Sequence, residues 1–249
     1  MKKLNLLLLV FGLMLGQHVS AQKSQYFEMR TYTAHEGKRP ELIKRFQDHT
    51  LKLFKKNGIE NIAYMIPNDD SDNRLVFIIG YPDESSRDRL WNQFVNDPEW
   101  VAAFKASEAN GPLVKEVQQT FMTMAPELNP KKFKSKKNET RVFELRTYHL
   151  HPGRVDAINA RFRDHTQALF EKHGMTNAPY WYTVEKGGEQ SKLVYLLAHK
   201  DEAAGKESFK KFGADPAWVA VRDASEADGK IVQKVESLYL KTLPFSPMK

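Results

Sequence analysis

The hexapeptide RFQDHT at residues 45–50 returns, with a single change, as RFRDHT at residues 161–166. The similarity extends outward from it, because residues 26–66 align without a gap to residues 142–182, with 18 identities in 41 positions. Similarity of this kind at a fixed offset indicates a duplicated structural unit. The hexapeptide also places a histidine, in both copies, where a helix is expected to carry an apolar side chain.

A second block repeats further along the chain: residues 75–121 align to residues 193–239, with 17 identities in 47 positions. The offset changes by two residues between the two blocks, within a polar stretch where a change of length is tolerated. We therefore expect two homologous domains, at residues 22–126 and 141–249, joined by a lysine-rich linker at residues 127–140.

The first 21 residues have the order of a secretory signal peptide. Two lysines precede an apolar run from Leu4 to Leu15, and the small residue Ala21 marks a cleavage site. The apolar run is shorter than the roughly 20 residues that a membrane-spanning helix requires. We expect cleavage after Ala21, a periplasmic or secreted mature protein, and no membrane insertion once the signal is removed.

Composition narrows the class of partner. The chain contains no cysteine, which excludes a disulfide framework and a thiolate metal site. Its formal net charge is +7, and the stretch from Pro130 to Thr140 carries five lysines against one glutamate, a pattern typical of a solvated linker. Because the basic residues are not interleaved with aromatic ones, nucleic acid is not an expected partner.

Within each copy, the spacing of apolar residues predicts secondary structure of both kinds. The predicted strands of the first copy are residues 25–33, 59–67, 74–81 and 113–124, and its predicted helices are residues 38–57, 83–96 and a segment that opens at Asp97. The resulting order is βαββαβ, a ferredoxin-like α+β arrangement with the helices on one face of an antiparallel sheet.

The third strand of each copy is apolar on both faces, as LVFII at residues 75–79 and LVYLL at residues 193–197 show. Such strands are expected to be covered on both sides. The helices cover one face, and the sheet of the other copy is the natural cover for the second. We expect two tandem ferredoxin-like units that form an intramolecular pseudo-dimeric α/β barrel, with further homo-oligomerisation left open.

The first predicted helix carries the repeated histidine on its apolar side. Leu42, Phe46, His49 and Leu53 are four, three and four residues apart and so share one face, and His165 holds the equivalent position in the second copy. A buried imidazole needs a hydrogen-bond partner. We therefore expect His49 and His165 to lie beneath the helix, and we treat both as candidate acid–base residues.

The first strand offers partners for these histidines. Glu28, Arg30 and Tyr32 lie on one of its faces. The second copy repeats them as Glu144, Arg146 and Tyr148. Mutual hydrogen bonding in one cleft favours the face toward the helix, although the barrel-facing orientation stays open. The two glutamates are candidate catalytic residues, and the arginines and tyrosines are candidate ligand-binding residues.

Two tryptophans complete the candidate cleft. Trp100 in DPEW and Trp218 in DPAW stand at the start of the last helix of each copy and are candidate ligand-binding residues; core packing is the alternative interpretation. Glu108 and Glu226 belong to a repeated ASEA segment and are weaker candidates.

The segments FEMRTYTAHEGK, RFQDHTLKLFKKNG, DPEW and ASEANGPLV resemble the NIPSNAP domain, a member of the dimeric α+β barrel group, and both copies carry the pattern over nearly their full length. The resemblance implies ferredoxin-like units that pair into a barrel. Related barrels include cofactor-free monooxygenases and haem-degrading enzymes that use a pocket between helices and sheet. The vesicle-traffic and mitophagy roles of mitochondrial members do not transfer to an exported chain.

Three classes of function stay open from the sequence. The cleft of each domain binds a small anionic or aromatic molecule, or it serves a cofactor-free monooxygenase- or isomerase-like enzyme, or the polar cluster is structural. The copies differ where Phe104 is replaced by Arg222, so the two clefts need not be equivalent. No cofactor is expected. No metal site is expected either, since His149 and His151 lack a third spaced ligand.

Overall fold

The computed structural model describes residues 24–130, 135, 141–185 and 192–249. The predicted signal peptide and the five lysines of the predicted linker lie outside these residues. The first half of the chain comprises β1 (Tyr26–Ala34), α1 (Arg39–Arg45), η1 (Phe46–Thr50), α2 (Leu51–Lys56), β2 (Glu60–Pro67), β3 (Arg74–Tyr81), α3 (Glu84–Val95), α4 (Pro98–Ser107) and β4 (Val114–Met124). The second half repeats this order as β5 (Val142–Leu150), α5 (Val155–Arg161), η2 (Phe162–Thr166), α6 (Gln167–Lys172), β6 (Thr176–Thr183), β7 (Lys192–His199), α7 (Glu202–Ala214), α8 (Pro216–Ser225) and β8 (Val232–Thr242).

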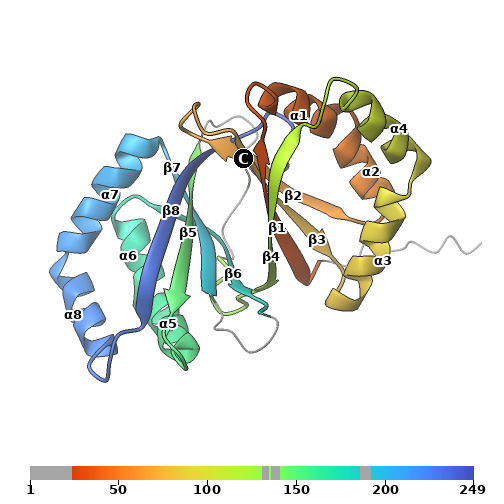
Figure 1. Cartoon of the computed structure of the whole chain (residues 1–249). Coiled ribbons are helices and arrows are strands. Elements are labelled where there is room, and N and C mark those ends of the chain that lie inside the picture. The colour runs from red at the N-terminus through yellow and green to blue at the C-terminus, as the bar shows by residue number, and fades with distance from the viewer. Residues whose placement is uncertain (1–23, 131–134, 136–140, 186–191) are drawn as a thin grey trace, which may run out of the picture.

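The strands form one closed antiparallel barrel in the order β1-β3-β2-β8-β5-β7-β6-β4. The two halves meet at two seams, β2 with β8 and β4 with β6, and each seam joins three residue pairs. Figure 1 shows the helices of each half on the outside, with the two sheets facing one another between them. The prediction of tandem ferredoxin-like units in an intramolecular barrel is confirmed, and the sheets are also joined edge to edge.

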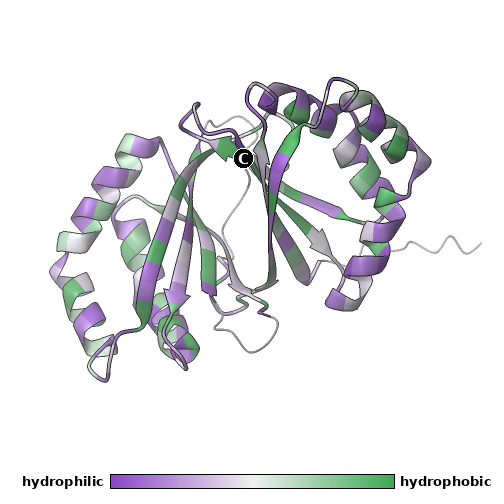
Figure 2. Ribbon diagram, viewed as in Figure 1, coloured by the Kyte–Doolittle hydropathy of each residue, from purple (hydrophilic) through white to green (hydrophobic). Residues whose placement is uncertain are grey.

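Alternation along the strands divides the core into layers. In β3, Leu75, Phe77 and Ile79 pack toward the helices of the first half, whereas Val76 and Ile78 pack inside the barrel. This explains why the strand is apolar on both faces. In Figure 2 apolar positions recur along these strands, while the outer helices alternate between hydrophilic and hydrophobic bands.

Each half also completes the core of the other through the segment that follows its last strand. After β4, the Ala125 amide donates to the Tyr180 carbonyl at 2.9 Å, and Leu128 is fully buried in the helix-side core of the second half. After β8, Leu243 makes the equivalent hydrogen bond to Tyr64 at 2.9 Å and joins the core of the first half. The halves therefore exchange short carboxyl-terminal segments.

The long helix of each half contains a single π turn at the repeated hexapeptide. The Leu51 amide donates to the Phe46 carbonyl, five residues earlier instead of four. The extra residue rotates the following side chains by about 100° relative to an uninterrupted α-helix. Thr50 consequently faces inward and its hydroxyl donates to the Arg45 carbonyl at 3.2 Å, while His49 is exposed.

The second half has the same arrangement, with Gln167 donating to the Phe162 carbonyl and Thr166 buried in the position expected for His165. The prediction that His49 and His165 lie buried beneath the helix is therefore wrong. It assumed an unbroken period of 3.6 residues, and the π turn places threonine on the inner face instead of histidine.

We expect His49→Ala and His165→Ala each to change the free energy of unfolding by less than about 0.5 kcal/mol, because both imidazoles are exposed. Thr50→Val should cost about 1–2 kcal/mol, since it keeps the side-chain volume but removes the donor to the Arg45 carbonyl. Urea denaturation of the three variants measures the difference. A larger loss at His49 than at Thr50 would contradict the π-turn register.

Candidate functional site

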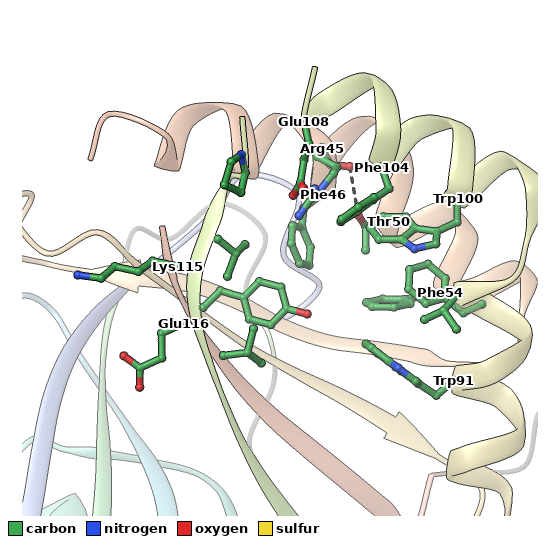
Figure 3. Close-up of a pocket in the computed structure, with 16 residues that line it drawn as sticks. Arg45, Phe46, Thr50, Phe54, Trp91, Trp100, Phe104, Glu108, Lys115 and Glu116 are labelled. Atoms are coloured by element: carbon green, nitrogen blue, oxygen red, sulfur yellow. Dashed lines mark hydrogen bonds and ion pairs between the residues drawn. The ribbon is translucent and has the colours of Figure 1, made fainter. Parts of the chain in front are cut away.

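A cavity of about 290 Å³ lies in the first half between the helices and the edge of the sheet formed by β1 and β4 (Figure 3). Seven of its sixteen lining residues are aromatic. The aromatic lining residues are Tyr32, Phe46, Phe54, Trp91, Phe94, Trp100 and Phe104. They come from β1 and from four helical segments, so the cavity depends on the helices docking against the sheet.

Arg45 supplies the buried positive charge of the cavity, and it is 4% exposed. Its Nη1 donates to Glu108 Oε1 at 3.0 Å and to Ser107 Oγ at 3.1 Å, and its guanidinium lies 5.1 Å from the centre of the Phe104 ring. The buried Nε has no hydrogen-bond partner among the described residues. The pairing with Glu108 compensates the cost of burying the charge, and Nε is left as an open donor.

The local sequence explains where α4 begins, and α4 carries the cavity-lining residues Trp100 and Phe104. Asp97 caps α4 by accepting a hydrogen bond from the Glu99 amide at 2.9 Å, and Pro98 occupies the first helical position. Trp100 and Phe104 are then four residues apart and face the cavity together. In Figure 3 both rings lie beside Arg45.

Tyr32 contributes a hydroxyl to the lining. Burial raises the pKa of this phenol above its ordinary value, because the ionised form would lose its solvation. Tyr32 is therefore protonated at neutral pH and can donate a hydrogen bond, but it does not provide a phenolate base.

Glu28 lies behind the cavity wall at the centre of a buried ionic network. It is fully buried and accepts hydrogen bonds from Arg87 Nε and Nη2 at 3.0 Å each, from the Tyr81 hydroxyl at 3.0 Å, and from Arg30. The Arg30 guanidinium lies 4.3 Å from the centre of the Trp91 ring. This network positions a tryptophan that lines the cavity, although neither Glu28 nor Arg30 lines the cavity itself.

The equivalent network in the second half has different members. Glu144 accepts from Arg146 and from the Ser237 hydroxyl at 2.6 Å, and it lies 3.1 Å from His199 Nε2. Gly205 replaces Arg87, and a β-carbon there would come within 2.9 Å of the Tyr239 ring. An arginine at this position would require the Tyr239 ring to shift.

The second cleft differs in its wall as well. Arg161 pairs with Glu226 at 3.2 Å and lies over the Trp218 ring at 5.4 Å, as Arg45 does with Glu108 and Trp100. The position of Phe104, however, is taken by Arg222, which pairs with Asp223 on the surface. The two clefts are therefore chemically inequivalent.

The structure divides the predicted site residues into three groups. Tyr32 and Trp100 line the cavity, whereas Glu28 and Arg30 face the helices as expected but lie behind its wall. The second-half counterparts hold the equivalent positions, and they are Glu144, Arg146, Tyr148 and Trp218. His49 and His165 instead line shallow surface grooves between the first helix and the last helix of each half.

The sequence did not single out Arg45 or Trp91, and it indicated Phe104 only as a difference between the two copies. Arg45 opens the repeated hexapeptide, and its recurrence at Arg161 beside a buried phenylalanine was the available signal. Trp91 is not repeated in the second copy, where Phe209 stands at the equivalent position, so the duplication could not single it out.

Within residues 24–130, 135, 141–185 and 192–249, no group of three or more His, Asp or Glu side chains is arranged to hold a metal ion. Over the same ranges, no helix has both the length and the apolar character to cross a membrane.

The barrel and the helix–sheet clefts define a protein of the dimeric α+β barrel class, here built within one chain. The family model described as NIPSNAP matches residues 27–128 and again residues 143–247. The chain therefore belongs to the NIPSNAP family, as a tandem pair of domains. A search of curated proteins finds no match.

Two solved structures show the same fold at low sequence identity, and a third shares the family name. A provisionally named monooxygenase from Fusobacterium nucleatum is 10% identical, covers 88% of this chain and 93% of its own, and superposes with a TM-score of 0.56. An anthrone oxidase-like protein is 12% identical over 90% of this chain and 94% of its own, with a TM-score of 0.55. An uncharacterised NIPSNAP domain protein from Burkholderia xenovorans is 26% identical over 45% of this chain and 99% of its own, with a TM-score of 0.35.

Proposed function

We propose that this protein binds a small, flat, aromatic molecule that carries an anionic or carbonyl oxygen, in the cavity of its first half. The observation that carries the proposal is the combination of an aromatic wall with the buried Arg45, whose Nε is without a partner among the described residues. Aromatic rings stack on a planar ligand, and the arginine donates to its oxygen.

The size of the cavity limits the ligand. A cavity of about 150 Å³ lined by apolar side chains accommodates benzene. The present cavity, at about 290 Å³, has room for one or two rings with a small substituent. Pockets for drug-sized molecules begin at about this volume.

The lining favours binding over catalysis. The described lining contains no histidine, since His49 and His165 lie on the surface. Tyr32 is held protonated by burial, and Glu108 is engaged by Arg45. A group poised to exchange protons near neutral pH is the usual requirement for acid–base catalysis. The oxidase and monooxygenase names of the structural neighbours come with 10–12% identity and indicate a shared fold.

Titration of the protein with 2-naphthoate in an isothermal titration calorimeter tests the proposal. Arg45→Met should weaken binding by about tenfold to a hundredfold, because a hydrogen bond to a charged group contributes about 1.5–3 kcal/mol. Arg161→Met removes the equivalent charge from the second half and serves as the matched control, with affinity expected to be unchanged.

Two outcomes would contradict binding at this site. One is the absence of saturable binding in the wild-type protein, and the other is an equal loss of affinity in Arg45→Met and Arg161→Met. Recovery of an altered compound after incubation would favour the enzyme interpretation. Melting temperatures of both variants show whether each remains folded.

We also propose that the protein acts in the periplasm or after secretion. The order of lysines, apolar run and small residue before Gln22 supports this location. Amino-terminal sequencing of the exported protein should begin at Gln22, and a mature protein that retains Met1 would argue against it.

A further inference from the structure

A second cavity, of about 280 Å³, lies inside the barrel and is lined by strands of both halves. The sheet separates it from the aromatic cavity, because successive residues of a strand face opposite sides. Tyr32 lines the aromatic cavity, for example, while its neighbour Thr31 lines the barrel cavity. The described lining of the barrel cavity contains no phenylalanine, tyrosine or tryptophan.

Equivalent positions of the two halves supply much of this lining. Thr31 corresponds to Thr147, and Arg74 corresponds to Lys192. The floor is apolar and continuous with the core of the barrel. The floor residues are Met29, Val76, Leu145, Val194 and Leu238. Neither half alone forms the cavity, so it exists only because the two copies close into one barrel.

Hydroxyl groups above this floor are free to bond to a ligand. Thr31, Thr120 and Thr147 line the cavity, and within the described part of the chain none of their hydroxyls makes a hydrogen bond to another residue. The hydroxyl of Thr183 differs, since it accepts from the Lys192 amide at 2.7 Å. Three hydroxyls from both halves are thus open donors and acceptors.

The polar side of the cavity also carries two cations. Arg74 uses Nε and Nη2 to bind Asp72, with Nε at 2.9 Å from Oδ1, which leaves Nη1 unengaged among the described residues. Lys192 lies 3.3 Å from Glu185 and is about one third exposed. The acidic lining residue Glu236 is already bound by Lys234 at 2.5 Å. Arg74 and Lys192 can therefore donate hydrogen bonds to an anion, while the charge of Glu236 is compensated by Lys234.

We propose that the barrel cavity is a second binding site, for a carboxylate that carries a short alkyl chain. The chain would lie on the apolar floor, and the carboxylate would accept hydrogen bonds from Arg74, Lys192 and the open threonine hydroxyls. Aliphatic chains are favoured over rings because the floor offers methyl and thioether groups instead of aromatic faces. This site does not depend on the aromatic cavity, since the two lie on opposite faces of the sheet.

Calorimetric titration with acetate, butyrate, hexanoate and octanoate tests this assignment. Affinity should rise from acetate to hexanoate, as apolar burial increases with each methylene, and should stop rising once the cavity is filled. The double variant Arg74→Gln with Lys192→Gln should lose about tenfold or more in affinity for hexanoate. The double variant Thr31→Val with Thr147→Val, which keeps the volume, should lose affinity to a smaller extent.

The matched control removes two positive charges elsewhere on the surface. Lys52→Gln with Lys241→Gln makes the same change in net charge, and neither lysine lines the barrel cavity. This control should bind hexanoate as the wild-type protein does. Arg45→Met should likewise bind it normally, which separates this site from the aromatic cavity.

Three results would overturn the assignment. These are the absence of binding of any of the four carboxylates at millimolar concentration, affinity that is independent of chain length, and an equal loss in the cavity double variant and the surface double variant. The melting temperature of each variant is measured in parallel, and if the charge variant is unfolded, the threonine variant alone decides between the outcomes.

Discussion

Replacing Glu28 with alanine should lower the free energy of unfolding by about 3–5 kcal/mol, the cost typical of removing one partner from a buried ionic pair. The carboxylate is fully buried and accepts hydrogen bonds from Arg30, Arg87 and Tyr81. Without it, the buried Arg30 would lose the only carboxylate it pairs with among the described residues, and Arg87 would keep only the exposed Asp88. Chemical denaturation monitored by circular dichroism measures the loss.

The chain provides a matched control for this prediction. Arg87 also pairs with Asp88 at 3.0 Å, but the Asp88 side chain is 84% exposed. Asp88→Ala should therefore cost less than about 1 kcal/mol, because surface pairs contribute little. If Glu28→Ala and Asp88→Ala lower the free energy of unfolding by similar amounts, burial does not determine how much these ion pairs stabilise the protein.

The Glu28 variant also connects stability to ligand binding. Arg30 packs over Trp91 at 4.3 Å, and Trp91 lines the aromatic cavity. A protein that remains folded after the milder change Glu28→Gln should bind 2-naphthoate less tightly, because Trp91 loses its fixed support. If Glu28→Gln binds 2-naphthoate with unchanged affinity, the ionic network has a structural role and does not support ligand binding.

Leu128→Ala is expected to destabilise the whole chain by about 2–5 kcal/mol, the range for truncating a buried leucine. Leu128 follows the last strand of the first half but is fully buried in the core of the second. Leu243 makes the reciprocal contact with the first half. Since each half completes the other, the variant should unfold in one cooperative transition at a lower denaturant concentration.

Leu128→Met is the control, because it preserves most of the volume and should cost less than about 1.5 kcal/mol. Calorimetry distinguishes the expected single transition from two separate ones. Two transitions, with only the second half shifted by Leu128→Ala, would show that the halves are stable independently and that the exchanged segments are dispensable.

The positions of the strands and of the helices were predictable because their signals are local. The alternation of Tyr26–Ala34 and the doubly apolar β3 follow from which faces are covered, and the Asp97 cap with Pro98 fixes the start of α4. The orientation of Glu28 and Arg30 toward the helices was also correct, because mutual hydrogen bonding left fewer unpaired groups.

The candidate site was less predictable. An uninterrupted α-helical period predicts His49 on the inner face, but the hydrogen bond from the Leu51 amide to the Phe46 carbonyl places Thr50 there instead. The sequence does not indicate the role of Arg45, because its partner Glu108 lies 63 residues away and no local pattern shows that the two meet at 3.0 Å.

The sequence alone determined that this protein is a duplicated NIPSNAP chain whose sheets must cover one another, because repetition and periodicity are written directly in the order of residues. Tertiary structure decided which side of the long helix faces inward, which arginine enters the aromatic cavity, and where the segments beyond each last strand pack. These outcomes depend on contacts between residues that are far apart in the sequence. The competing arrangements differ in free energy by about the contribution of one hydrogen bond, and no local sequence pattern indicates which of them is favoured.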